Sequence, residues 1–306
     1  MIAVSTLRTE PTGQAPVAPP AIADRIAVGV EVSRSGLAAL EWATAETAGT
    51  GAHLTVCHVQ GHDDDDPAPD PSTLALTRPD LERYIRRSRQ RVGAGQCSVE
   101  LPPGDLVRAL LALSERADLL VVGSRNKADP LHRSVASRLA AQAHCPVVIV
   151  RPVMGYEAAP FAGHVVVGVD GTPASAAAVR LAFAYARRHG RAVTAVHVDD
   201  RRPGDFWVDD RFLETHFTAE PPGLDLLARA VEPVAAGFPR IPVQRAVYGG
   251  DPVDGLRRAA SGAALLVLGR HGHRRPAPLR LGSTSRAFAS RAACVVAVVP
   301  EDTQPD

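Results

Sequence analysis

Short runs of Val, Ile and Leu alternate with longer Ala-, Leu- and Arg-rich stretches along most of this 306-residue chain. The short runs are nearly continuous in apolar character, which is typical of strands buried on both faces of a parallel sheet. The longer stretches have the length and composition of helices. This order of strand and helix predicts an α/β fold of doubly wound sheets with helices on both faces.

The same series of elements is predicted twice. Strands are expected at 25–31, 52–59, 96–101, 118–123 and 146–151, and then at 164–170, 191–198, 242–248, 264–269 and 294–299. Helices are expected at 35–48, 79–93, 104–116 and 133–144, and then at 173–189, 222–236, 251–261 and 283–292. Each series is a five-stranded sheet with its own helices.

The residues of the two halves also match one another. The segment 26–33 reads IAVGVEVS, and the segment 165–172 reads VVVGVDGT. An offset of roughly 140 residues is an ordinary domain size, so we predict two tandem domains, the first repeat at 24–152 and the second repeat at 162–300. Residues 1–23 are rich in Pro, Ala and Thr and lack a long apolar core, which predicts a disordered leader; 301–306 form a tail.

A glycine pattern stands out in the second repeat. Gly269 ends a predicted strand, Gly272 follows it, and Gly282-Ser283-Thr284 opens the next helix. Glycine lets the backbone approach a ligand closely, and the N–H groups at a helix start attract anions such as phosphate. The spacing matches neither a Walker loop nor the G-x-G-x-x-G turn. By itself the pattern leaves two interpretations open, a phosphate-binding loop and a strand-to-helix loop without a ligand.

The duplicated series and the glycine spacing together resemble the universal stress proteins of the adenine-nucleotide α-hydrolase-like superfamily. The likeness covers about residues 24–152 and 162–300, and the second repeat matches the ATP-binding signature position by position. The resemblance implies that ATP, alone or with Mg²⁺, binds the second repeat. The implied binding residues are Asp170, Val198, Gly249, Gly250, Gly269, Gly272, Gly282, Ser283 and Thr284.

The resemblance also implies a role for each of these residues. Asp170 contacts the ribose or the adenine, and the backbone of Val198 recognises the adenine edge. The Gly249-Gly250 turn closes the pocket. The remaining residues cradle the phosphates and ribose.

The first repeat departs from this signature. Glu31 stands in place of Asp170, Asn126 in place of Gly272, Arg133-Ser134-Val135 in place of 281–283, and Pro102-Pro103-Gly104 in place of the glycine turn. Side chains at glycine positions crowd a phosphate. We therefore predict that the first repeat is degenerate and serves as a structural partner.

The last strand of each repeat is a Val-rich run, at 147–150 and 295–299, and each is expected at a sheet edge. An apolar edge with free N–H and C=O groups invites pairing. The connection within one chain favours pairing with each other. We predict that the repeats pack as a pseudo-twofold pair through these strands. Further association into a homodimer stays open.

Three functions are compatible with these patterns. The loops of the superfamily's pyrophosphatases and synthetases are absent from the sequence, and no catalytic residue is identified. The preferred hypothesis is a nucleotide-binding stress regulator with at most weak ATPase activity. The alternatives are a slow ATPase that uses a divalent cation, and a structural stress module that binds no nucleotide.

Composition bears on the partners and the cellular location of the chain. A net charge of +1 gives no electrostatic case for nucleic acid, and no apolar run approaches a membrane span of about 18 residues. The four cysteines, Cys57, Cys97, Cys145 and Cys294, form no C-x-x-C pair and are interpreted as buried reduced thiols. We therefore expect a cytoplasmic protein without a bound structural metal. His58 and His197 are expected to be packed, hydrogen-bonded histidines rather than bases.

Overall fold

A computed structural model of the chain describes residues 22–59, 78–124, 134–151, 160–199, 223–272 and 280–301. Apart from Ile22, Ala23 and Glu301, the predicted leader and tail lie outside these residues, as do Asn126 and Arg133. Within these ranges every predicted strand and helix is present, and the ends agree to within two residues.

The first repeat contains β1 (Arg25–Gly29), α1 (Arg34–Thr47), β2 (His53–Cys57), α2 (Arg78–Val92), β3 (Cys97–Glu100), α3 (Leu106–Ser114), β4 (Leu119–Gly123), α4 (Val135–Gln142) and β5 (Val147–Val150). The second repeat contains β6 (Val165–Gly168), α5 (Pro173–His189), β7 (Val193–Asp199), α7 (Leu224–Ala235), β8 (Val243–Gly249), α8 (Pro252–Ala259), β9 (Leu265–Gly269), α9 (Ser283–Ser290) and β10 (Val296–Val299).

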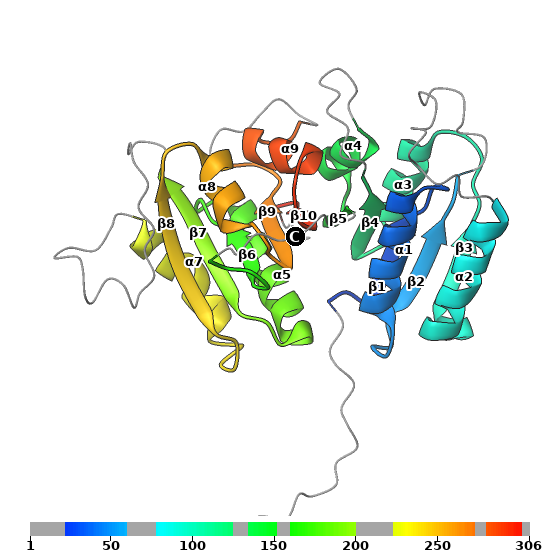
Figure 1. The fold of residues 1–306 in the computed structure, drawn as a ribbon, viewed down its shortest axis with the longest axis horizontal. Coiled ribbons are helices and arrows are strands. Elements are labelled where there is room, and N and C mark those ends of the chain that lie inside the picture. The colour runs from blue at the N-terminus through cyan, green and yellow to red at the C-terminus, as the bar shows by residue number, and fades with distance from the viewer. Residues whose placement is uncertain are drawn as a thin grey trace, which may run out of the picture.

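The two predicted sheets are joined into one ten-stranded sheet of order β3-β2-β1-β4-β5-β10-β9-β6-β7-β8 (Figure 1). All neighbouring strands are parallel except β5 and β10, which are antiparallel, with Val148 opposite Ala297 at the centre of the pairing. The predicted pseudo-twofold packing through the last strands is therefore confirmed. Pairing removes both apolar edges from solvent, and every residue of these two strands is buried.

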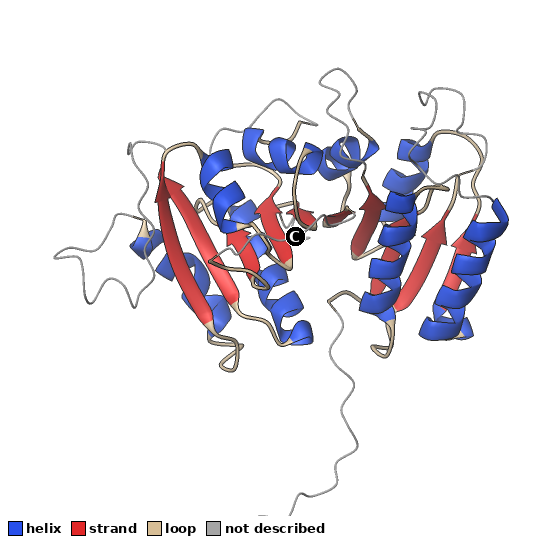
Figure 2. Ribbon diagram, viewed as in Figure 1, coloured by secondary structure: helices blue, strands red, loops and turns tan. Residues whose placement is uncertain are grey.

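Helices cover both faces of the sheet (Figure 2). The core on one face is formed with α1, α2, α5 and α7, and includes the fully buried Leu40 and Phe183. The core on the other face is formed with α3, α4, α8 and α9, and includes Leu110 and Phe288. Each core contains residues of both repeats. Both faces of the sheet are therefore buried, as the nearly continuous apolar runs of the strands predict.

A second contact joins the repeats on the α1–α5 side. The Glu46 carboxylate is buried and accepts hydrogen bonds from Arg188 Nε at 2.9 Å and from His189 Nε2 at 2.9 Å. Trp42 and Tyr185 stack beside it with ring centroids 6.2 Å apart. Because removing one partner of a buried ion pair is costly, this cluster ties α1 firmly to α5.

All four cysteines are free thiols in buried positions, as predicted. Burial raises the pKa of Cys145 to about 12 and that of Cys294 to about 11. Thiols with such pKa values are unreactive at neutral pH. Within the described part of the chain, no helix combines the length and the apolar character that crossing a membrane requires.

Candidate functional site

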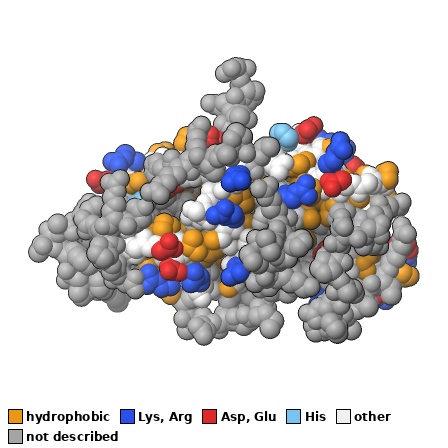
Figure 3. All heavy atoms as spheres, turned by 90° about the horizontal axis from the view of Figure 1, so that it is seen from above, with side chains coloured by type: hydrophobic (Ala, Val, Ile, Leu, Met, Phe, Trp, Pro, Cys, Tyr) orange, Lys and Arg blue, Asp and Glu red, His pale blue; other side chains and the backbone are white. Residues whose placement is uncertain are grey.

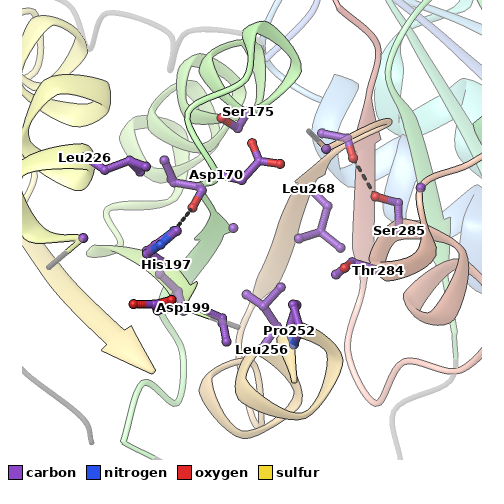
Figure 4. A pocket seen from close by; sticks show the side chains of 18 of the residues that line it. Asp170, Ser175, His197, Asp199, Leu226, Pro252, Leu256, Leu268, Thr284 and Ser285 are labelled. Carbon is purple, nitrogen blue, oxygen red and sulfur yellow. Dashed lines mark hydrogen bonds between the residues drawn. The ribbon is translucent and has the colours of Figure 1, made fainter. Parts of the chain in front are cut away.

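A cavity of about 1160 Å³ lies at the carboxyl ends of the strands of the second repeat. Ligand sites typically occupy about 300–1,000 Å³, so the space is sufficient for a nucleotide. The ends of β6, β7 and β9 and the first turns of α5, α7, α8 and α9 form its walls (Figure 4). This is where doubly wound sheets bind ligands.

The structure brings most of the predicted binding residues together in this cavity. The residues that line it are Asp170, Val198, Gly250, Gly269, Gly272, Gly282, Ser283 and Thr284. The exception is Gly249, which is buried as the last residue of β8 and pairs with Asp199. Gly250 has φ = +100°, a conformation that favours glycine, and it turns the chain from β8 toward α8.

Asp170 lies just beyond β6 and is held by the start of α5. Its Oδ1 accepts hydrogen bonds from the backbone N–H of Thr172 at 3.1 Å and from the Thr172 hydroxyl at 2.7 Å. A Cβ at Gly272 would lie 2.7 Å from Asp170 Oδ2. A side chain at this position would therefore require the Asp170 carboxylate to shift.

The helix starts around the cavity differ in how their N–H groups are capped. Thr172 caps α5 by accepting from Ser175 N–H, and Asp251 caps α8 by accepting from Val253 N–H. The residue at the start of α9 is Gly282, which has no side chain to cap the helix. Uncapped N–H groups at a helix start form an anion site, so α9 presents such a site to the cavity.

Helix α7 also starts at a glycine, Gly223, but it carries Asp225 in its first turn. A carboxylate there repels anions, whereas the first turn of α9 holds no acidic residue. The two ends of the cavity therefore differ in charge. In Figure 4, Asp199 and His197 lie on one side, and the hydroxyl residues Thr284 and Ser285 lie on the other.

In the first repeat, side chains engage the equivalent helix starts. Ser134 caps α4 by accepting from Ser137 N–H at 3.2 Å, at the position that Gly282 occupies in α9. The Glu31 carboxylate accepts from the Ser33 hydroxyl at 2.7 Å and from the Ser35 hydroxyl at 3.3 Å. Its longer side chain is therefore engaged with the start of α1.

Gly269 serves packing as well as lining the cavity. A Cβ on Gly269 would meet Ala174 C at 2.8 Å, and a Cβ on its counterpart Gly123 would meet Ser35 C at 2.4 Å. Both glycines let a helix start press against the end of a strand. This shared requirement explains why Gly123 is present in the first repeat, where Asn126 and Ser134 replace Gly272 and Gly282.

His197 is hydrogen-bonded, as predicted, because its Nδ1 donates to the Val169 carbonyl oxygen at 2.9 Å. His58 makes the same bond to Val30 at 2.9 Å. Both rings are thus fixed at the end of the second strand of their repeat.

Several lining residues were not identified from the sequence. They are Ser175, Asp199, Asp225, Leu226, Arg229, Asp251, Pro252, Leu256, Leu268 and Ser285, together with Gly168, Val169, Val196 and Gly223. Asp199 and Asp251 directly follow a predicted strand and a Gly-Gly turn, which is a usable signal. The position of α7 relative to the sheet is not encoded in a local motif.

The face of the molecule seen in Figure 3 carries both basic and acidic side chains beside hydrophobic ones.

Comparison with known proteins identifies close parallels. The model of the Universal stress protein family matches residues 23–151 and again residues 162–300. Universal stress protein Rv2005c of Mycobacterium tuberculosis is 30% identical over 297 residues, which cover 89% of this chain and 96% of the relative.

Solved structures show the same fold. A universal stress protein from Archaeoglobus fulgidus aligns with a TM-score of 0.61 at 16% identity, covering 93% of this chain and 98% of that one. A shorter universal stress protein solved in complex with cAMP covers 42% of this chain at 26% identity, with a TM-score of 0.32.

Proposed function

We propose that this chain, which belongs to the universal stress protein family, is a stress regulator that responds to ATP bound in its second repeat. The residues of the cavity fit such a ligand. The space is about 1160 Å³, and its lining at position 272 is a glycine without a side chain to occupy it. The uncapped start of α9 offers N–H groups to a phosphate.

The observation that carries the proposal is the difference between two equivalent helix starts. Gly282 leaves the first turn of α9 open toward the cavity, whereas Ser134 fills the same place on α4 with its own hydroxyl. A phosphate bound at α9 gains charge-assisted hydrogen bonds from the N–H groups there, whereas at α4 the Ser134 hydroxyl already accepts from Ser137 N–H. The proposal therefore assigns ATP to the second repeat.

The cavity's polarity suggests how the nucleotide is oriented. The phosphates lie at α9, against Gly269, Gly272, Gly282, Ser283 and Thr284. The adenine and ribose lie toward β6 and β7, where Asp170 and the backbone of Val198 contact them, with Gly250 closing the turn. Mg²⁺ bound together with ATP would neutralise part of the phosphate charge.

We expect ATP turnover to be weak or absent. Asp170 Oδ1 already accepts two hydrogen bonds from Thr172, which hold this carboxylate at the start of α5. The proposed orientation also places it away from the γ-phosphate. A regulator needs only binding, and its ATP-dependent step is a change in the packing of the repeats.

The test combines identification of the ligand with turnover. Mass spectrometry of small molecules released from the purified chain is expected to detect ATP. Hydrolysis measured with Mg²⁺ should stay far below the median enzyme rate of ~10 s⁻¹. A rate near that median would instead favour the ATPase alternative, and failure to bind added ATP would favour a structural module.

A further inference from the structure

Two arginines, the buried Arg151 and the half-buried Arg270, cross between the repeats at the centre of the molecule. Arg151, just after β5, donates to the carbonyl oxygens of Phe288 and Ala289 near the end of α9. Arg270, just after β9, donates to the carbonyl oxygen of Ala143, which ends α4. Each guanidinium therefore sits at the carboxyl end of a helix of the other repeat, where the helix dipole favours a cation.

The two arginines are not copies of one another. Arg151 follows β5, and the residue in that place after β10 is Pro300. Arg270 follows β9, and the residue in that place after β4 is Ser124, which accepts from Arg151 Nη2 at 3.3 Å. Each repeat thus contributes one arginine that contacts the other repeat. The two arginines lie at non-equivalent positions, so they do not follow the pseudo-twofold symmetry.

The two side chains differ in exposure, because Arg151 is buried and Arg270 is half-buried. Arg151 is 2% exposed, and burial lowers its pKa to about 10, which leaves it charged at neutral pH. The Nε atoms of Arg151 and Arg270 are buried without a hydrogen-bond partner among the described residues. Their hydrogen bonds to helix-end carbonyls therefore offset part of the free-energy cost of burying each charge.

Arg270 is also part of the cavity loop. It lies between Gly269 and His271, which line the cavity, and its carbonyl oxygen accepts from Gly282 N–H at 3.0 Å. Its backbone thus joins the loop after β9 to the start of α9, while its side chain reaches α4. Arg151 holds the opposite end of the same short helix.

We propose that the first repeat completes the nucleotide site of the second, with Arg270 and Arg151 as positioning residues. Arg270, held by the α4 carbonyl, fixes the phosphate loop against Gly282. Arg151 fixes the far end of α9, so that its first turn faces the cavity. This inference rests on the proposed function, and it gives the degenerate repeat a role in binding that requires no ligand of its own.

The test compares Arg270→Met with Arg188→Met. Arg188 is the control, because its side chain is buried, crosses the interface and donates to the Ala45 carbonyl oxygen at 2.7 Å; it also pairs with Glu46, so its loss disturbs the interface at least as much. It lies at the carboxyl end of α5, away from the cavity. Titration calorimetry with Mg-ATP is expected to show about a tenfold loss of affinity for Arg270→Met and none for Arg188→Met.

A second measurement does not depend on ATP. Hydrogen exchange at the amides of Gly282 and Arg286 in the ligand-free chain should accelerate in Arg270→Met and stay unchanged in Arg188→Met. Arg270→Lys, which keeps the charge but has a single donor group, should retain the fold and lose affinity about threefold.

The outcomes separate the two proposals. Unchanged affinity and unchanged exchange in Arg270→Met would overturn the positioning role. An equal loss in both methionine variants would also overturn it, because the contacts would then serve only the interface. If the unmodified chain binds no ATP, the proposed function fails, and the exchange measurement alone decides whether Arg270 positions α9.

Discussion

Replacing Gly282 by Val should weaken ATP binding about ten- to hundredfold while leaving the fold intact. A charge-assisted hydrogen bond contributes about 1.5–3 kcal/mol, and the branched side chain displaces the phosphate from at least one N–H group of α9. The backbone tolerates the change, because Gly282 has φ = −56° and its Cβ would meet its nearest neighbours at 3.5 Å. Calorimetric titration with ATP measures the affinity.

The matched control is Ser134→Val, at the same place in the first repeat. It removes the cap of α4 and should cost about 1 kcal/mol of stability without changing ATP affinity. Gly282→Ser adds the first repeat's own capping residue to α9 and should also weaken binding. Unchanged affinity in both Gly282 variants would show that α9 does not hold the phosphates.

Replacing Ala297 by Asp should destabilise the chain by at least about 4 kcal/mol at pH 7. That is the free energy needed to protonate a carboxylate of ordinary pKa so that it can enter an apolar site. Ala297 is fully buried and pairs with Val148 at the centre of the junction between the repeats. Guanidinium denaturation followed by circular dichroism measures the loss.

Val99→Asp is the control for this substitution. Val99 lies in β3 at the outer edge of the same sheet and is 36% exposed, so a carboxylate there stays hydrated. The expected change is within about 1 kcal/mol. Equal stability of Ala297→Asp and the unmodified chain would mean that the β5–β10 junction does not hold the repeats together in solution.

The fold was predictable from the sequence because its strands are buried on both faces. Runs such as 118–123 and 264–269 are apolar throughout, and that character survives only between two layers of helices. The junction followed from the same logic, since two Val-rich runs at the ends of their repeats each needed a partner. The pairing of these two runs was inferred from their apolar edges, from their connection in one chain and from the resemblance to universal stress proteins.

The candidate site was predictable only where a local motif encodes it. Gly272 and Gly282 are visible from their spacing in the sequence, and a Cβ at position 272 would lie 2.7 Å from Asp170 Oδ2. The lining contributed by α7, including Arg229, depends on how a helix packs, which no short pattern specifies. The crossing made by Arg270 depends on contacts 127 residues apart in sequence.

The role predicted for Gly269 was incomplete, because this glycine also serves packing. Gly269 was assigned to the phosphate cradle, yet a Cβ there would first collide with Ala174 at the start of α5. The same collision, with Ser35, accounts for Gly123 in the first repeat. The difference between the repeats that bears on ligand binding therefore lies at Gly282 and Ser134 rather than at the strand ends.

The stoichiometry of ATP binding tests the central claim most directly. Isothermal titration of the purified, nucleotide-free chain with Mg-ATP should give one site per chain, and Gly282→Val should weaken that site while Ser134→Val leaves it unchanged. Two equal sites per chain, or a single site abolished by the Ser134 variant and not by the Gly282 variant, would contradict the assignment of ATP to the second repeat.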